Sequence, residues 1–245
     1  MNGRIRRPDL SSLELPEVGR LRIGKKERSR NGKEYPVSVD YFIPTGKYAG
    51  MFEKALGDHP STIQIVFPSD DAEKVCRERY EYRDDRGALV AYGDGYTFYA
   101  WTGKCYERFD TDEYPDIMEQ ITANNPTKRG EENWDIVLTM RFIIPSVRGI
   151  VGVWQFSTKG KASSVKNIRD SFDGVQKIRG TVTQTVFDLS VVFAKSNKPD
   201  TASRYPVVSL IANDTRIEEI RQTLQPKENL SLLTAKCGSD ESSDK

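Results

Sequence analysis

Aromatic and cationic side chains alternate between residues 77 and 110, and together they could bind a nucleic acid. Bases stack on aromatic rings while phosphates meet positive charge, so rings beside cations on a β surface suit a single-stranded ligand. The two-residue period of a strand places Tyr96 and Phe98 on one face, and Tyr99 and Trp101 on the other. The candidate binding residues of this stretch are Tyr82, Arg83, Tyr96, Phe98, Trp101, Lys104 and Arg108. Sheet aromatics also form cores, and nearby carboxylates nearly cancel these cations, so core packing is the alternative interpretation.

A second set of cations lies in the first 33 residues, where basic side chains outnumber acidic ones. The candidates for contacting DNA or a partner there are Arg20, Arg22, Lys25 and Lys26. A β-hairpin is predicted from Asn31-Gly32, a strong turn signal between the apolar stretches 21–23 and 35–43. A solvated basic surface is the alternative interpretation. The net charge of the chain is only +1, so any attraction to nucleic acid must be local.

Residues suited to catalysis or metal binding are scarce. His59 is the only histidine and sits in a Gly-Asp-His-Pro turn without partners at triad spacing. The cysteines have no CxxC or histidine partners, so no zinc, cofactor or catalytic residue is predicted. Four carboxylates of a polar loop could gather a magnesium ion, as a nuclease requires. They are Asp110, Asp112, Glu113 and Asp116, and a metal-dependent nuclease is kept as the less favoured hypothesis.

The composition is that of a soluble globular protein of 245 residues, with 37% hydrophobic and 30% charged residues. No apolar run approaches the roughly 20 residues that span a bilayer, and the basic N-terminus has no apolar signal segment. The odd number of widely spaced cysteines argues against a disulfide framework and for a reducing compartment. We therefore expect a cytoplasmic protein without a membrane partner.

The elements that must position these residues are clearest between residues 136 and 211. Residues 136–144 alternate in the manner of a strand, and 150–158 read as a second strand. A helix is expected over 163–179, followed by a left-handed glycine, Gly180. Its apolar residues are Val165, Ile168, Phe172, Val175 and Ile178. Gly174 inside this helix indicates close approach by a neighbouring backbone. Strands at 182–194 and 205–211 complete a strand-strand-helix-strand-strand unit.

From residue 35 to 109 the pattern is mostly β, with a helical piece near 48–56. Short, closely spaced strands of this kind suit a small barrel or a curved sheet. The predicted fold class is α+β, with antiparallel β-sheets, a small barrel-like N-terminal part and the later strand-strand-helix-strand-strand unit. The predicted divisions are a basic flexible arm (1–17), a β-rich domain (18–110), a polar connector (111–133), an α+β domain (134–225) and a flexible tail (226–245). Alternatively, residues 18–225 form a single domain.

Short motifs spaced along most of residues 19–213 carry a family resemblance. The strongest is Gly152-Val153-Trp154-Gln155-Phe156-Ser157-Thr158, followed by Ser163, Ser164, Val165, Asn167 and Ile168. The others are Gly19-Arg20-Leu21-Arg22-Ile23-Gly24, Tyr35-Pro36, Asp40-Tyr41-Phe42, Ala88-Leu89-Val90, Gly93-Asp94-Gly95 and Tyr205-Pro206-Val207-Val208-Ser209-Leu210. In their order and spacing, these motifs resemble those of phage and prophage recombination directionality factor-like proteins.

The resemblance implies a non-enzymatic protein of a mobile element that binds a recombinase, DNA or both. Some relatives bind a large serine integrase and redirect it from integration to excision, so a large serine integrase or another recombination protein is the expected partner. Many relatives carry a mid-chain cysteine cluster where this chain has Ala91 and Tyr92, and only Cys105 remains between these residues and Trp154. Zinc is therefore not expected. The hypothesis from a different class is a single-stranded DNA-binding protein of phage replication or recombination.

Overall fold

The computed structural model describes residues 15–128, 133–159, 163–195 and 204–216. The predicted tail at 226–245 and the predicted arm at 1–17, apart from its last three residues, lie outside these ranges. Within the described ranges, no helix is both long and apolar enough to cross a membrane.

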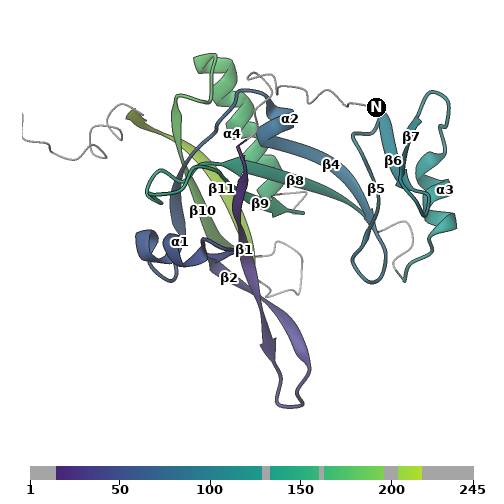
Figure 1. Cartoon of the computed structure of the whole chain (residues 1–245), viewed down its shortest axis with the longest axis horizontal. Coiled ribbons are helices and arrows are strands. Elements are labelled where there is room, and N and C mark those ends of the chain that lie inside the picture. Colours follow the sequence, from purple (N-terminus) through teal and green to yellow (C-terminus); the bar gives the residue numbers. More distant parts are fainter. Residues whose placement is uncertain (1–14, 129–132, 160–162, 196–203, 217–245) are drawn as a thin grey trace, which may run out of the picture.

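The larger of the two sheets has eight strands in the order β2-β1-β9-β8-β4-β5-β6-β7 (Figure 1). Its strands are β1 (Glu17–Arg28), β2 (Glu34–Thr45), β4 (Cys76–Arg83), β5 (Leu89–Gly93), β6 (Thr97–Trp101), β7 (Tyr106–Asp110), β8 (Trp134–Phe142) and β9 (Val153–Thr158). Neighbouring strands are antiparallel except β1 and β9, which are parallel. The expected barrel-like N-terminal part is wrong, because β8 and β9 insert between β1 and β4 and leave an open sheet with β2 and β7 at its edges.

The smaller sheet has three antiparallel strands in the order β11-β10-β3. These are β3 (Thr62–Val66), β10 (Thr185–Lys195) and β11 (Arg204–Arg216). Helix α4 (Ser164–Arg179) packs against β11, and the Ser164 hydroxyl accepts a hydrogen bond from the Val208 N–H at 2.9 Å. The shorter helices are α1 (Ala49–Leu56), α2 (Ala72–Val75) and α3 (Ile117–Asn124). The predicted α+β class with antiparallel sheets is confirmed.

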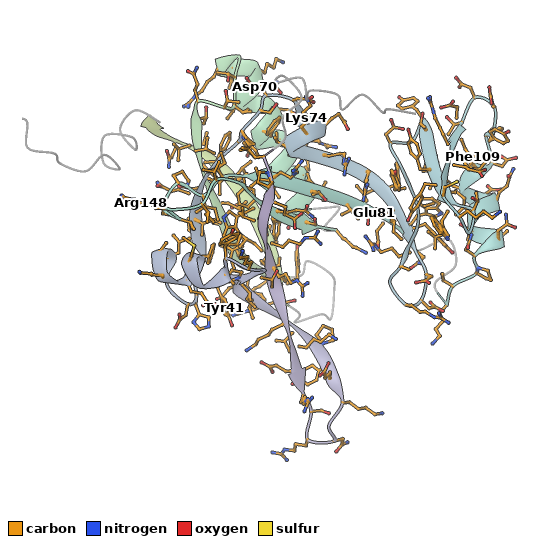
Figure 2. All side chains as sticks on the ribbon, in the orientation of Figure 1. Tyr41, Asp70, Lys74, Glu81, Phe109 and Arg148 are labelled. Atoms are coloured by element: carbon orange, nitrogen blue, oxygen red, sulfur yellow. The ribbon has the colours of Figure 1, made fainter. Side chains whose placement is uncertain are left out.

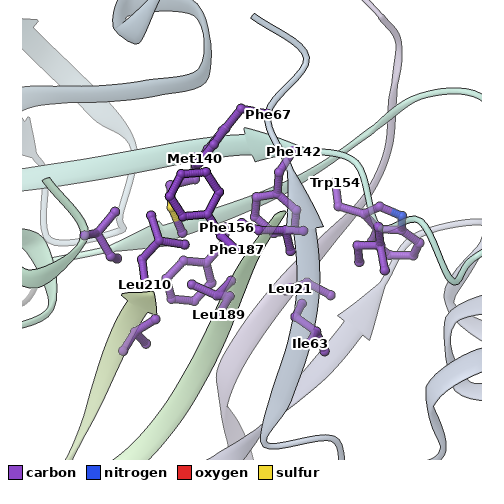
Figure 3. Close-up of a cluster of buried hydrophobic side chains, with 14 of the residues drawn as sticks. Leu21, Ile63, Phe67, Met140, Phe142, Trp154, Phe156, Phe187, Leu189 and Leu210 are labelled. Carbon is purple, nitrogen blue, oxygen red and sulfur yellow. The ribbon is translucent and has the colours of Figure 1, made fainter. Parts of the chain in front are cut away.

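Two clusters of buried apolar side chains hold these elements together. The larger joins both sheets and α4, and Figure 3 shows part of it around Phe142, Phe156 and Phe187. The smaller joins the β4–β7 meander to α3. Its buried members are Tyr82, Val90, Ala91, Phe98, Ala100, Ile117, Ile121 and Trp134. The meander therefore has a core of its own, and that core covers one face of its strands.

The predicted strand-strand-helix-strand-strand unit is present in the chain as β8, β9, α4, β10 and β11, but its strands divide between the two sheets. Strands that precede the predicted connector at 111–133 also pair with strands that follow it. β3 pairs with β10, and β4 pairs with β8. This mixing favours the alternative in which residues 18–225 form a single domain, and the division stays a prediction.

The predicted apolar stripe of helix α4 is buried in the first part of the helix and exposed at its last residue. Val165, Ile168 and Phe172 are buried, whereas Ile178 is 85% exposed. Successive three-residue steps rotate the apolar stripe backwards by about 60° each, so the last step leaves the buried face. Gly180 ends the helix with a φ of 74°, as expected. The close approach expected at Gly174 is wrong, because a Cβ there meets no atom within 4 Å among the described residues.

Candidate functional site

A groove with a volume of about 510 Å³ lies on one face of the larger sheet, across β1, β9, β8 and β4. Its cationic lining residues are Arg20, Arg22, Arg77, Arg79, Arg83 and Lys159. Among the lining residues that the structure describes, Glu81 is the one carboxylate. The remaining lining residues are Leu21, Val137, Thr139, Gln155 and Ser157. We call this surface the basic groove.

The alternation of strand β4 builds one wall of the basic groove. Arg77, Arg79, Glu81 and Arg83 are two residues apart, so their side chains lie on one face of the strand. The intervening residues face the other way, and Tyr82 among them is fully buried in the meander core. The opposite face of β4 packs into the core through Cys76, Tyr80 and Tyr82, and its one charged residue, Glu78, pairs with Arg169 at 3.3 Å.

Glu81, toward the end of β4, holds two of these arginines in place (Figure 2). One carboxylate oxygen accepts hydrogen bonds from Arg79 at 2.6 and 2.9 Å, and the other accepts from Arg83 at 2.7 and 3.0 Å. Burial of Glu81 opposes its ionisation, but the hydrogen bonds and positive charges of the two arginines outweigh burial and lower its pKa. The triad keeps a net charge of +1 in a fixed geometry.

The other cations of the basic groove differ in how far they are neutralised. Arg20 pairs with Glu17 at 2.6 Å, and Lys159 pairs with Asp135 at 2.9 Å. Arg22 and Arg77 are exposed and have no carboxylate within 4 Å among the residues that the structure describes. The groove is therefore positive overall, and these two arginines are its least compensated charges.

A second groove, with a volume of about 320 Å³, adjoins the first and shares Arg77 and Arg79 with it. Tyr92, Tyr99 and Arg108 of the meander also line it, together with the carboxylates Glu73, Glu78 and Asp94. The Arg79 guanidinium lies 4.6 Å from the centroid of the Tyr92 ring, a distance at which cation and ring attract each other. Tyr92 and Tyr99 stack with their centroids 5.1 Å apart and their planes 15° from parallel. Cations and aromatic rings thus share one continuous face.

Two predicted binding residues are core residues instead. Tyr82 and Phe98 are 0% and 1% exposed, so neither ring can stack on a ligand. Both lie on the meander face that Trp134 and α3 cover, with ring centroids 5.1 and 5.5 Å from that of Trp134. The Tyr82 hydroxyl donates to the Asn125 carbonyl at 2.7 Å. The expectation that these two rings bind nucleic acid is therefore wrong.

The remaining meander candidates are exposed but spread over different places. Tyr96 is 80% exposed in the turn before β6, and Lys104 is exposed in the turn between β6 and β7. Trp101 is 47% exposed at the end of β6. Arg108 lines the second groove and pairs with Asp110 at 2.8 Å. The structure brings Arg83 and Arg108 to the two adjoining grooves and leaves Tyr96, Trp101 and Lys104 outside both linings.

The N-terminal candidates divide between two regions. Arg20 and Arg22 line the basic groove, whereas Lys25 and Lys26 lie on the two-stranded end of the β1–β2 hairpin, which protrudes from the sheet (Figure 1). We call this end, residues 24–38, the ribbon. Lys25 pairs with Glu27 at 2.8 Å, and Lys26 pairs with Glu34 at 3.5 Å. Lys25 and Lys26 therefore each have a carboxylate partner, although five basic and two acidic side chains leave the ribbon with a net charge of +3.

The carboxylates of the nuclease hypothesis do not converge. Asp110 accepts a hydrogen bond from the Thr97 hydroxyl at 2.8 Å, and this bond and the Arg108 guanidinium lower its pKa. No group of three or more His, Cys, Asp or Glu side chains in the described part of the chain could hold a metal ion. Burial raises the pKa of the Cys76 thiol to about 12. The nuclease hypothesis therefore lacks the ion site that it requires among these residues.

Five cationic or aromatic residues that line the two grooves were not among the sequence candidates: Arg77, Arg79, Tyr92, Tyr99 and Lys159. A signal for the two arginines was present, since charged residues occupy every second position from 77 to 83. Lys159 carried no such signal, because it enters the groove only through the pairing of β9 with β8 and β1.

A family model described as Gp3-like, recombination directionality factor-like, matches residues 18–213. No curated protein and no solved structure matches the chain. The matched range contains both grooves and, apart from Glu17 at the start of β1, every strand of the larger sheet.

Proposed function

The chain belongs to the recombination directionality factor-like family, and we propose that it is a non-enzymatic accessory protein of phage or mobile-element DNA recombination that contacts DNA through the basic groove. The observation that carries the DNA contact is the charge of this groove. Six cations line it, its one lining carboxylate is held by two of them, and Arg22 and Arg77 have no carboxylate partner among the described residues. Clustered guanidinium groups suit phosphates, which they contact through charge-assisted hydrogen bonds.

The shape of the groove also suits a backbone rather than a small anion. It crosses four strands and continues into the second groove through Arg77 and Arg79. Hydroxyl and amide side chains between the cations, at Thr139, Gln155 and Ser157, add neutral partners of the kind that contact phosphate oxygens. A polyanion that follows this path meets several cations at once, which explains why so many gather on one face.

A protein partner is the second part of the proposal. The family description points to recombination, so a large serine integrase or another recombination protein is the partner we propose. Exposed apolar side chains in the smaller sheet favour such a contact, because they lie outside both grooves. Val192, Phe193 and Tyr205, near one end of the β10–β11 pair, are 53%, 38% and 42% exposed. Apolar groups of this kind suit the buried centre of a protein interface.

The DNA contact is tested with two double variants that remove the same charge. Arg22→Gln/Arg77→Gln acts in the basic groove, and Lys25→Gln/Lys26→Gln acts in the ribbon. Binding to labelled DNA is measured by fluorescence anisotropy at fixed salt. We expect the groove variant to bind about tenfold more weakly, because two phosphate contacts are lost. The ribbon variant should bind as the wild type does, because its lysines are already paired.

Equal weakening in the two variants would contradict the groove assignment, because it would show a dependence on net charge alone. Binding of the wild type to a purified recombinase but not to DNA, with loss in the groove variant, would replace DNA by an acidic protein surface. Variants Val192→Ser and Phe193→Ser should weaken recombinase binding and leave DNA binding unchanged.

A further inference from the structure

We propose that the nucleic acid bound by this face is a single strand, with its phosphates in the basic groove and its bases stacked on an aromatic row of the meander. The aromatic row comprises Tyr99, Tyr92, Tyr106 and Trp101. This inference rests on the proposed function and specifies the ligand of the same site.

The aromatic row is continuous across three strands. Tyr92 of β5 lies opposite Tyr99 of β6, and Trp101 of β6 lies opposite Tyr106 of β7. The ring centroids of Tyr92 and Tyr106 are 5.4 Å apart, and those of Tyr106 and Trp101 are 5.3 Å apart. The Tyr106 hydroxyl donates to the Leu89 carbonyl at 2.7 Å, which orients its ring. Four rings are thus held side by side on the meander face opposite to its core.

The open end of this row can accept a base. Trp101 and Tyr106 are 47% and 38% exposed, whereas Tyr92 and Tyr99 are half-buried by their neighbours. A base that stacks on an aromatic ring contributes about 5- to 150-fold in affinity, and every base has a face that can stack. Trp101 is the largest ring and the most exposed of the four, so we assign it the first stacking position.

Cations lie directly beside the rings. Arg79 belongs to the basic groove and also covers Tyr92, and Arg108 lies opposite Tyr99 on the neighbouring strand. A strand that leaves the basic groove past Arg79 reaches the rings through the second groove, where Arg77, Arg79 and Arg108 lie among the carboxylates Glu73, Glu78 and Asp94. Alternation of rings and cations on one sheet face is the arrangement that binds single strands with little sequence preference.

A duplex would use only half of this surface. Its bases are paired and stacked inside the helix, so it can offer phosphates to the cations but no base face to Trp101. An acidic protein would likewise satisfy the cations alone. The rings therefore distinguish the three ligands, and they favour the single strand.

Tryptophan fluorescence provides the test, because one tryptophan reports on the site. Trp134 and Trp154 are 8% and 1% exposed, whereas Trp101 is open to solvent. The full-length protein is titrated with a short oligothymidine, with an abasic strand of the same length and with a duplex. We expect quenching with oligothymidine only, and loss of that quenching in Trp101→Phe. Affinity for oligothymidine should fall about tenfold in Trp101→Ala and largely return in Trp101→Phe.

The matched control is Tyr35→Ala, which removes a ring of similar exposure, 44%, from the ribbon and should leave binding unchanged. Equal affinity for the abasic strand and oligothymidine, with no effect of Trp101→Ala, would overturn the stacking proposal. The assignment of the basic groove as the phosphate-binding surface would still hold if Arg22→Gln/Arg77→Gln weakened binding of the abasic strand. Tighter binding of the duplex than of either strand would overturn the single-strand inference alone.

Discussion

Strand β1 contributes cations to two regions, the basic groove and the ribbon, and the same residue types behave differently in each. Arg22 faces a groove shared with β9, β8 and β4, and has no carboxylate partner among the described residues. Lys25 and Lys26, only a few residues later, pair with Glu27 and Glu34 of the hairpin itself. The difference shows that the position of nearby carboxylates, and not the local density of basic residues, decides which cations remain available to a ligand.

The two regions also differ in what lies behind them. In the groove region β1 packs on the main core, where Leu21 is 3% exposed and Trp154 of β9 is 1% exposed. In the ribbon β1 has β2 as its one strand neighbour among the described residues, and most of its side chains are exposed. We therefore expect substitutions in the groove half to affect stability and binding, and matched substitutions in the ribbon half to affect neither.

The largest expected difference is between two glycines of β1. A Cβ at Gly19 would run into the Trp154 ring and lie 2.9 Å from the Thr45 carbonyl oxygen. Gly19→Ala should therefore lower the free energy of unfolding by about 3 kcal/mol, because the packed core must shift. A Cβ at Gly24 would meet its nearest atom, the Val37 carbonyl oxygen, at an ordinary 3.5 Å. Urea denaturation monitored by circular dichroism measures both variants.

Gly24→Ala should leave the unfolding free energy unchanged or raise it by up to about 1 kcal/mol, because alanine suits a strand better than glycine. Similar losses in the two variants would show that the ribbon is as tightly packed as the groove region, and the comparison would fail.

A smaller difference is expected between two carboxylates that each face two cations. Glu81 is buried and holds Arg79 and Arg83 by four hydrogen bonds, whereas Glu34 lies 3.5–3.6 Å from Lys26 and Arg28 in solvent. Glu81→Gln should destabilise the fold by about 2 kcal/mol, because buried charged hydrogen bonds lose their acceptor charge. Glu34→Gln should change the unfolding free energy by at most about 0.5 kcal/mol, as for other surface ion pairs.

The pH dependence of unfolding separates the charge of Glu81 from a packing effect. Its pKa is lowered on folding from an ordinary value of 4.5, so its stabilisation is complete above about that pH. This stabilisation is lost as the pH falls through the lower folded pKa. The gap between wild type and Glu81→Gln should therefore be full at neutral pH and close in acid. A gap that stays constant in acid would assign the effect to packing.

Most elements of this fold could be predicted from local patterns, whereas their neighbours in space could not. The hairpin at Asn31-Gly32, the β4–β7 meander and helix α4 follow from turn signals and periodicity within a few residues. The insertion of β8 and β9 between β1 and β4 depends on long-range pairing, which short strands do not specify alone. Because of that pairing, the strands form an open sheet and not the expected barrel.

The candidate site could be predicted only in part, because it too depends on long-range pairing. Alternation correctly placed Tyr99 and Trp101 on one face of β6 and Phe98 on the other. It could not tell which face α3 and Trp134 would cover, so Tyr82 and Phe98 were assigned to a ligand although they are core residues. The groove required four strands from three parts of the sequence to meet, and only the two arginines of β1 and Arg83 were identified from its cations.

The most direct test of the difference between groove and ribbon is the salt dependence of binding to a single strand. The slope of log Kd against log salt counts phosphate contacts, at about 0.7 per contact for a single strand. Arg22→Gln/Arg77→Gln should reduce the magnitude of this slope by about 1.4, and Lys25→Gln/Lys26→Gln should leave it unchanged. Equal reductions in both double variants, or an unchanged slope in the groove variant, would contradict the assignment of the basic groove as the DNA-contacting surface.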